Sequence, residues 1–436
     1  MAISLRGIAS ALQQPVGVLP LIAFRIAFGV VMSLSIIRFI ASGWVASQYI
    51  DPAFHFSYVG FAWVKPLPGD GMMLVFAALL LCAVGIALGM FYRACVAAFC
   101  ILFAYVQLID QALYLNHYYL VWLLSFLMLW LPLHCRLSID AWRKPALRAA
   151  HLPAWMLVAL RLQIGLVYVF AGIAKLNEDW LQRAMPLALW LPTLRELPLI
   201  GGLLAERVTA FLMSWIGALY DLTIPFLLLH HRARPAAFAA VIAFHVLTAL
   251  FFPIIGMFPW IMLAASLVFL PAGRAGDDAP AVALPRPPRP FVWVLAAYFA
   301  LQVALPLRHW LYPGDVLWTE EGFRLSWRVM LVDKAGDALF RLRDPTSGRE
   351  WWQPPGAYLT RQQEMQMSYQ PDMLLQFAHF LEAEYRAQGY DDLEVYAEVH
   401  VAFNGRPSRL LIDPTTDLTR YPPSLLHKPF ILPLEG

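Results

Sequence analysis

Long apolar runs are the feature of this 436-residue chain that most restricts how it can fold. A helix needs about 20 consecutive apolar residues to cross roughly 30 Å of hydrocarbon. Because 60% of the residues are apolar and only 14% charged, with a mean hydropathy of +0.60, an ordinary soluble globule is excluded. The chain is predicted to be a polytopic α-helical membrane protein. About nine transmembrane helices are expected, over residues 20–40, 71–91, 94–110, 118–133, 154–175, 208–229, 235–252, 257–271 and 291–307.

Lysine and arginine in the short loops predict the orientation, because cytoplasmic loops are enriched in them. One set of alternate loops holds eleven: Arg6, Arg93, Arg136, Arg143, Lys144, Arg148, Arg232, Arg234, Arg274, Arg286 and Arg289. The other set holds four: Lys65, Arg183, Arg195 and Arg207. We therefore expect a cytoplasmic N-terminus and, after nine spans, a periplasmic or luminal C-terminal part. The net charge of +3 is small and scattered, and it does not indicate a nucleic-acid partner.

The chain becomes more polar near residue 310, which predicts a transmembrane domain over 1–310 and a β-rich extramembrane domain over 311–436. In LEVYAEVHVAF (393–403) apolar and polar residues alternate, as in a half-buried strand. FRLSWRVML (323–331) and RLLID (409–413) are predicted as further strands. PDMLLQFAHFLEAEYRAQG (371–389) instead has the spacing of an amphipathic helix, which Pro371 begins and Gly389 ends.

Three ionisable residues lie near the predicted outer ends of the spans: Lys175, His117 and His245. An ionisable group inside a membrane costs free energy, so each of these three residues is expected to have a structural or chemical role. Lys175 can be an interfacial anchor, half of an ion pair, or a base kept dry enough to lose its proton. His117, between Asn116 and Tyr118, also suits an aromatic belt. His245 equally suits a core histidine bonded to a carbonyl.

The surroundings of Lys175 decide between these alternatives. Eight uncharged residues precede it, and burial among apolar groups favours a neutral amine. Glu178 or Asp179 beside the amine would instead hold the ammonium form. Asp221, in ALYDLTIPF, is a further candidate partner for a lysine or a histidine. The residues alone leave these alternatives open, and they predict a pocket at the outer helix ends beside the interrupted segment FFPIIGMFPW.

Seven motifs occur in an order that resembles the vitamin K-dependent γ-glutamyl carboxylases, within the wider group that carries the HTTM (horizontally transferred transmembrane) domain. They are FRIAFGVVMSL, LGMFYR, LNHYYL, LRLQIGLVYVFAGIAKLNEDW, AFHVLTALFFPIIGMF, GFRLSWRVM and VYAEVHVAFNGRPSRLLIDP, between about residues 20 and 415. The resemblance implies a bacterial-type membrane lyase that oxygenates a reduced naphthoquinone to its epoxide. The strong base formed on the way removes a γ-hydrogen from glutamate, and CO2 then adds.

The resemblance also implies the partners and the site. Reduced vitamin K or menaquinol from the membrane would be the cofactor, with O2 and CO2 as co-substrates and no metal. A glutamate-containing peptide or protein would be the substrate. Through AGIAKLNEDW, Lys175 matches the lysine that deprotonates the hydroquinone. The implied catalytic residues are Lys175, His117 and Asn116, and the implied cofactor-binding residues are His245, Phe244 and Tyr118.

Departures from the animal enzymes favour epoxidation over carboxylation of a protein. Ala174 stands where those enzymes have a second lysine, no cysteine follows Cys135, and the outer domain is short. Two alternatives therefore remain. One is a quinol epoxidase or oxidoreductase without carboxylation, and the other is a non-catalytic transporter or lipid-binding membrane protein on the same scaffold.

Overall fold

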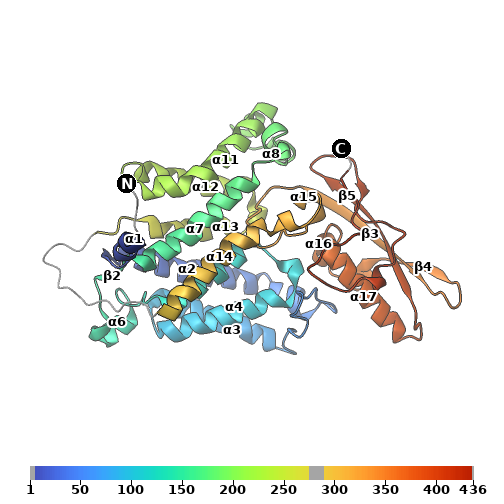
Figure 1. Ribbon diagram of the computed structural model, residues 1–436, viewed down its shortest axis with the longest axis horizontal. Coiled ribbons are helices and arrows are strands. Elements are labelled where there is room, and N and C mark those ends of the chain that lie inside the picture. Colours follow the sequence, from blue (N-terminus) through green and yellow to red (C-terminus); the bar gives the residue numbers. More distant parts are fainter. Residues whose placement is uncertain (1–4, 274–288, 435–436) are drawn as a thin grey trace.

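The computed structural model describes residues 5–273 and 289–434, which form a helical bundle with a smaller domain at one end of it (Figure 1). Seven of the described helices are long and apolar enough to cross a membrane. They are α2 (Leu19–Ala41), α3 (Gly71–Leu88), α4 (Tyr92–Ile109), α7 (Ala154–Ala174), α11 (Arg207–Leu229), α12 (Arg234–Phe251) and α14 (Arg289–Leu307). The predicted fold class, a polytopic α-helical membrane protein, is confirmed.

Two of the nine predicted spans correspond to shorter helices. The first, α5 (Asn116–Trp130), has 15 residues and a length of about 22 Å. It ends before Leu131 because the residue that precedes a proline, here Pro132, avoids helical dihedral angles. The second, α13 (Phe258–Ser266), has nine residues and continues into a 3-10 turn, Leu267–Phe269. The count of nine spans therefore stays a prediction.

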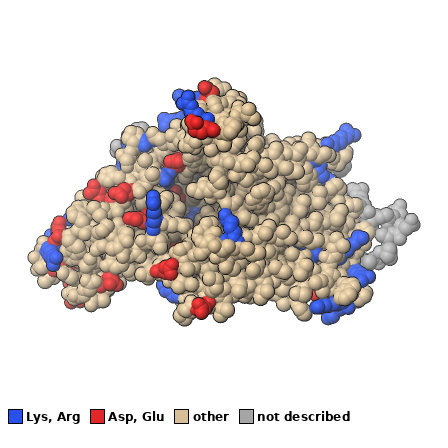
Figure 2. All heavy atoms as spheres, turned by 180° about the vertical axis from the view of Figure 1, so that it is seen from behind, with Lys and Arg blue, Asp and Glu red and all other residues tan. Residues whose placement is uncertain are grey.

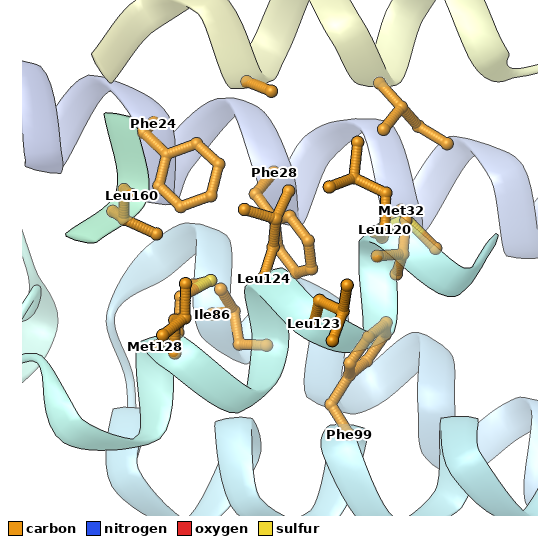
Figure 3. Close-up of a cluster of buried hydrophobic side chains, with 14 of the residues drawn as sticks. Phe24, Phe28, Met32, Ile86, Phe99, Leu120, Leu123, Leu124, Met128 and Leu160 are labelled. Atoms are coloured by element: carbon orange, nitrogen blue, oxygen red, sulfur yellow. The ribbon is translucent and has the colours of Figure 1, made fainter. Parts of the chain in front are cut away.

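Apolar side chains, among them residues of α2, α3, α4, α5 and α7, fill the centre of the bundle around α5 (Figure 3). The labelled residues are Phe24, Phe28 and Met32 of α2, Ile86 of α3, Phe99 of α4, Leu120, Leu123, Leu124 and Met128 of α5, and Leu160 of α7. Each of them is at most 3% exposed. This core holds α5 in the middle of the bundle, and with it the N-terminal end that carries Asn116 and His117.

Short elements connect the spans. The helices are α1 (Leu5–Leu12), α6 (Ile139–Arg143), α8 (Glu178–Gln182), α9 (Leu187–Trp190) and α10 (Gly201–Leu204). A π-helix covers Ala46–Ile50, and 3-10 turns cover Gln111–Leu113, Pro145–Leu147, Leu191–Leu194 and Pro253–Ile255. Strands β1 (Pro15–Gly17) and β2 (His151–Pro153) form a small antiparallel pair. Elements α8, α9 and α10 lie between α7 and α11, where the site is built.

The C-terminal domain is built on an antiparallel sheet of order β4-β3-β5-β6. Its strands are β3 (Lys334–Arg343), β4 (Glu350–Gln353), β5 (Glu394–Phe403) and β6 (Arg409–Leu410). Helices α15 (Val316–Thr319), α16 (Arg361–Met367) and α17 (Pro371–Arg386) accompany it, with 3-10 turns at Arg308–Leu311, Pro355–Ala357 and Leu418–Arg420. The ring of Phe377 in α17 packs 5.0 Å from that of Phe340 in β3. The predicted strand at 393–403 and helix at 371–389 are confirmed.

The strand predicted at 323–331 is wrong. Leu325, Trp327 and Met330 have φ angles of 61°, 60° and 56°. These left-handed conformations cannot continue a strand. Trp327 is instead buried against the bundle, with its ring stacked 5.1 Å from that of Tyr119. The strand predicted at 409–413 is reduced to the two residues of β6.

Lysine and arginine gather at the end of the bundle farthest from the C-terminal domain, with few acidic side chains among them (Figure 2). Arg93 lies in the first turn of α4, and Arg136, Arg143 and Arg148 lie in the connection between α5 and α7. Arg274 and Arg286, which also entered the charge count, lie outside the described residues. The two ends of the molecule therefore differ in charge.

Candidate active site

Lys175 lies directly after α7 and turns inward. The helix stops here because Asn177 begins α8: its side-chain oxygen accepts a hydrogen bond from Trp180 N (2.9 Å), and its amide donates to Ala174 O (2.8 Å). Lys175 Nζ donates to Asp221 Oδ2 of α11 at 2.6 Å. Both side chains are buried, 8% and 7% exposed. Lys175 is therefore half of a buried ion pair rather than an anchor in solvent.

Gly172 allows α11 to approach α7 closely enough for this pair to form. A Cβ at position 172 would lie 2.7 Å from Leu222 Cγ and 2.9 Å from the backbone nitrogen of Leu222. No real side chain fits at such distances. Because Leu222 follows Asp221 in sequence, the same close approach brings the Asp221 carboxylate to the lysine.

Glu178 and Asp179, the nearest acidic residues in sequence, do not hold the amine. Asp179 accepts two hydrogen bonds from Arg406 of the C-terminal domain, at 2.7 and 2.8 Å, and one from Asn404 at 2.9 Å. Burial alone would raise the pKa of Asp179, but the hydrogen bonds from Arg406 and Asn404 lower it. The Glu178 side chain is 67% exposed. Asp179 therefore joins the two domains and leaves the partnership with Lys175 to Asp221.

Lys175 and Asp221 line a cavity of about 100 Å³, which we name the lysine cavity. Its polar lining includes His245 of α12 and Tyr168 of α7, whose hydroxyl lies 3.1 Å from His245 Nε2. His245 Nδ1 is buried and has no hydrogen-bond partner among the described residues. The indole ring of Trp180 lies 5.2 Å from Lys175 Nζ. The cavity thus combines an ion pair and an imidazole in mainly apolar surroundings.

The C-terminal domain contributes to the same cavity. Val329 and Met330, from the segment between α15 and β3, line it together with Phe258 of α13 and Met213 of α11. The site is therefore built from both parts of the chain, at the end of the bundle where the C-terminal domain sits (Figure 1).

The other predicted site residues do not all line the same cavity. Phe244 also lines the lysine cavity, with its ring stacked 4.1 Å from that of Tyr220. His117 and Tyr118 line a second cavity of about 770 Å³, between the bundle and α16, which we name the seam cavity. Asn116 lines neither of these two: its amide donates to Arg328 O at 3.1 Å, and its oxygen accepts from the Tyr114 hydroxyl at 2.9 Å.

Phe258 lies between the two cavities. Its ring centroid is 6.1 Å from that of His117 and 5.8 Å from that of His245. Met257, the preceding residue, lines the seam cavity, whereas Phe258 lines the lysine cavity. The Phe258 ring therefore contacts both histidines.

Sequence reasoning did not single out Tyr168, Trp180 or Phe258. A signal for Tyr168 was available, because it precedes Lys175 by seven residues, which is about two helical turns and the same face of α7. No such spacing pointed to the others. Among the described residues, no three His, Cys, Asp or Glu side chains gather where a metal ion could be held.

The bundle, the C-terminal domain and the buried pair between them define a polytopic membrane protein with a candidate active site where its two domains meet. The HTTM domain matches residues 13–273. The vitamin K-dependent gamma-carboxylase lumenal domain matches residues 288–436. The chain therefore belongs to the vitamin K-dependent gamma-carboxylase family. No solved structure was found to match it.

Proposed function

We propose that this chain is a vitamin K-dependent γ-glutamyl carboxylase-like enzyme of the membrane, in which Lys175 and Asp221 together take the proton of a reduced naphthoquinone. The observation that carries the proposal is the pair itself. An ion pair buried at 2.6 Å beside a histidine, in a cavity at the junction of two family-defining domains, is the arrangement expected of a buried base.

The isolated neutral amine was one of the alternatives that the sequence left open for Lys175, and the pair takes its place in this proposal. Lys175 and Asp221 have zero net charge whether the shared proton lies on nitrogen or on oxygen. In the first arrangement the carboxylate can accept one further proton, and in the second the amine can. A proton taken from a hydroxyl in the cavity thus leaves a cationic pair beside an anion, and that contact is favourable where water is excluded.

The hydroquinone, when bound, supplies through its reaction with O2 the driving force for removing a glutamate γ-hydrogen, which no side chain is basic enough to remove. The protein orients the hydroquinone and excludes water from the cavity. His245, fixed through Nε2 by the Tyr168 hydroxyl, presents its unpartnered Nδ1 as a hydrogen-bonding group for a ring oxygen. Phe244 and Trp180 add aromatic surface that keeps water away from the pair.

The lysine cavity must widen to admit a bicyclic ring, because ligand pockets usually measure about 300–1,000 Å³ and this one about 100 Å³. Three of its lining residues are methionines: Met213, Met262 and Met330. Methionine has three rotatable bonds and repacks readily around a ligand. We expect these side chains to move when the ring enters.

The position of Phe258 supports coupling between two half-reactions. Oxygenation would take place in the lysine cavity, and the glutamate would be held in the seam cavity beside His117. Because the Phe258 ring contacts both histidines, the two half-reactions would take place close to one another. Tyr118, which also lines the seam cavity, would contribute apolar surface there.

The charge distribution supports an N-terminus in the cytoplasm and a C-terminal domain outside, in the periplasm or lumen. The Lys- and Arg-rich end of the bundle lies opposite the C-terminal domain (Figure 2). In that orientation both cavities lie toward the outer face, as the predicted pocket requires. Menaquinol would be the natural cofactor in a bacterial host.

Purified protein in detergent, given reduced vitamin K, O2, labelled bicarbonate and a short glutamate peptide, tests the proposal. We expect both epoxide and fixed label from the wild type, and a loss of both by about a hundredfold or more in Lys175→Ala, as for removal of a general base. Lys65→Ala is the matched control, because Lys65 lines neither cavity. Lys65→Ala should match the wild type.

The outcomes separate the rival functions. Epoxide without fixed label would replace the carboxylase by a quinol epoxidase. No product from the wild type, or equal product from Lys175→Ala, would contradict both and leave a transporter or lipid-binding role.

A further inference from the structure

The seam cavity has a wall from each part of the chain. Its floor is formed by the outer end of α2, the π-helix Ala46–Ile50 and the break between α12 and α13, while α16 of the C-terminal domain forms its roof. Gln48 of the π-helix donates to the side-chain oxygen of Gln362 in α16 across this gap, at 3.4 Å. At about 770 Å³ it is large enough for several residues of an extended peptide.

Arg38 is the more buried of the two cations that line this cavity. Its guanidinium lies over the Trp44 ring, 4.9 Å from the centroid, and its Nε is buried without a hydrogen-bond partner among the described residues. Over residues 5–273 and 289–434, no carboxylate lies within ion-pair distance of the Arg38 guanidinium. Gly256, with a φ of 66°, leaves room for the guanidinium, since a Cβ there would lie 3.3 Å from Arg38 Nη2. Arg38 is thus held in place but not neutralised.

The lining of the seam cavity is cationic and rich in amides. Arg38 and Arg361 line it together with Gln48, Gln362 and Gln366, and none of its described lining residues is Asp or Glu. A guanidinium binds a carboxylate through two parallel hydrogen bonds, and its charge is permanent. Amide side chains can bond a peptide backbone as donors and acceptors. Phe39, Tyr49 and Met365 supply apolar surface between these groups.

We infer that the seam cavity binds an extended acidic peptide, with Arg38 making the contact to a side-chain carboxylate. The inference rests on the proposed function only in identifying that carboxylate as the glutamate to be modified. The alternative anion at this depth is a lipid phosphate, but a lipid does not need the glutamine-bearing roof that α16 provides. His117 would lie beside the bound carboxylate, on the side of the cavity near Phe258.

Peptide binding to the purified protein tests the inference without any turnover. The probes are a labelled six-residue peptide of alanine and leucine with one central glutamate, and its glutamine twin, followed by fluorescence anisotropy. We expect the wild type to prefer the glutamate peptide by about tenfold or more, as for a hydrogen bond to a charged group. Arg38→Gln should abolish the preference, and Arg38→Lys should retain part of it. Arg195→Gln, a loss of charge outside the cavity, should leave it unchanged.

Equal binding of the two peptides by the wild type overturns the inference, and this holds even if Arg38→Gln does not fold. An unchanged preference in folded Arg38→Gln overturns it too. The inference is also overturned if Arg38→Gln loses binding to anionic phosphatidylglycerol vesicles but keeps binding to the peptide. The site would then be a lipid site. If the wild type prefers the glutamate peptide but forms no epoxide, the proposed function fails and this inference stands.

Discussion

At the scale of single residues, the unusual feature is that a lysine and an aspartate form a buried ion pair inside a membrane protein. Taking both charges out of water is costly, and their attraction offsets this only because the atoms lie 2.6 Å apart. Their contribution to stability can therefore be small while their contribution to chemistry is large. Stability and activity should respond differently to removal of one partner and of both.

Single variants that break the pair should unfold more easily than a variant that lacks both charges. Lys175→Met and Asp221→Leu each leave an unpaired buried charge, which typically costs about 3–5 kcal/mol. The double variant Lys175→Met/Asp221→Leu should recover most of that loss and still form no epoxide. Thermal unfolding in detergent, together with the epoxide assay, measures both. Full activity in the double variant would exclude the pair as the base.

At the scale of secondary-structure elements, the site depends on how closely α7 and α11 pack. Gly172 and Gly165 both lie on α7 near α11, but their surroundings differ. A Cβ at Gly172 would meet Leu222 at 2.7 Å, whereas a Cβ at Gly165 would meet only Pro225, at an ordinary 3.7 Å. The two glycines therefore provide a matched comparison.

Gly172→Ala should push the two helices apart and lengthen the distance between Lys175 and Asp221. Because a misplacement of about 1 Å can cost a hundredfold in rate, we expect epoxide formation to fall by about that factor. Gly165→Ala should leave the rate near the wild-type value and slightly raise stability, because alanine favours a helix. Initial rates of epoxide formation for the two purified variants decide this. Similar rates would mean that close packing of the helices does not set the site.

The Asp179–Arg406 contact, between α8 and the segment after β5, should make the association of the two domains sensitive to acid. The pKa of Asp179 is lowered in the folded protein, so its stabilising contribution is present above the unfolded pKa of about 3.9. That contribution is lost as the pH falls through the lower, folded pKa. The unfolding temperature should therefore drop below about pH 4 more steeply in the wild type than in Asp179→Asn.

At pH 7, Asp179→Asn should cost about 1.5–3 kcal/mol, as for hydrogen bonds to a charged group. Asp337→Asn, at an exposed position on β3, is the control and should change neither the unfolding temperature at pH 7 nor its decline in acid. Equal acid profiles for the wild type and Asp179→Asn would show that this contact does not join the domains.

At the scale of the whole molecule, hydropathy predicted the bundle well and the site only in part. Each predicted span corresponds to a helix, because apolar runs of that length must be buried in lipid or in protein. Asp221 was a candidate partner for a lysine or a histidine, but the choice of Lys175, 46 residues away, could not be read from the sequence. The contact of Asp179 with Arg406, 227 residues away, was not predicted. Such contacts depend on packing that no local pattern encodes. The segment 323–331 was misassigned because burial of Trp327 outweighs its local strand propensity.

The orientation of the whole chain is testable by labelling from one side of the membrane. In a variant lacking Cys82, Cys95, Cys100 and Cys135, a cysteine would be placed either at Ser347 in the C-terminal domain or at Ala146 at the other end. Both positions are exposed. A maleimide that cannot cross membranes should label Ser347→Cys in intact spheroplasts, and Ala146→Cys only after permeabilisation. The opposite pattern would reverse the proposed topology.

The contact of Asn404 and Arg406 with Asp179 also has a consequence for biosynthesis. These two residues follow Asp179 by 225 and 227 positions, so they emerge from the ribosome long after α8, which they contact. Until then the C-terminal domain does not yet cover Trp180 and the Lys175 amine. Translation order thus delays completion of the lysine cavity until residue 406 has been made.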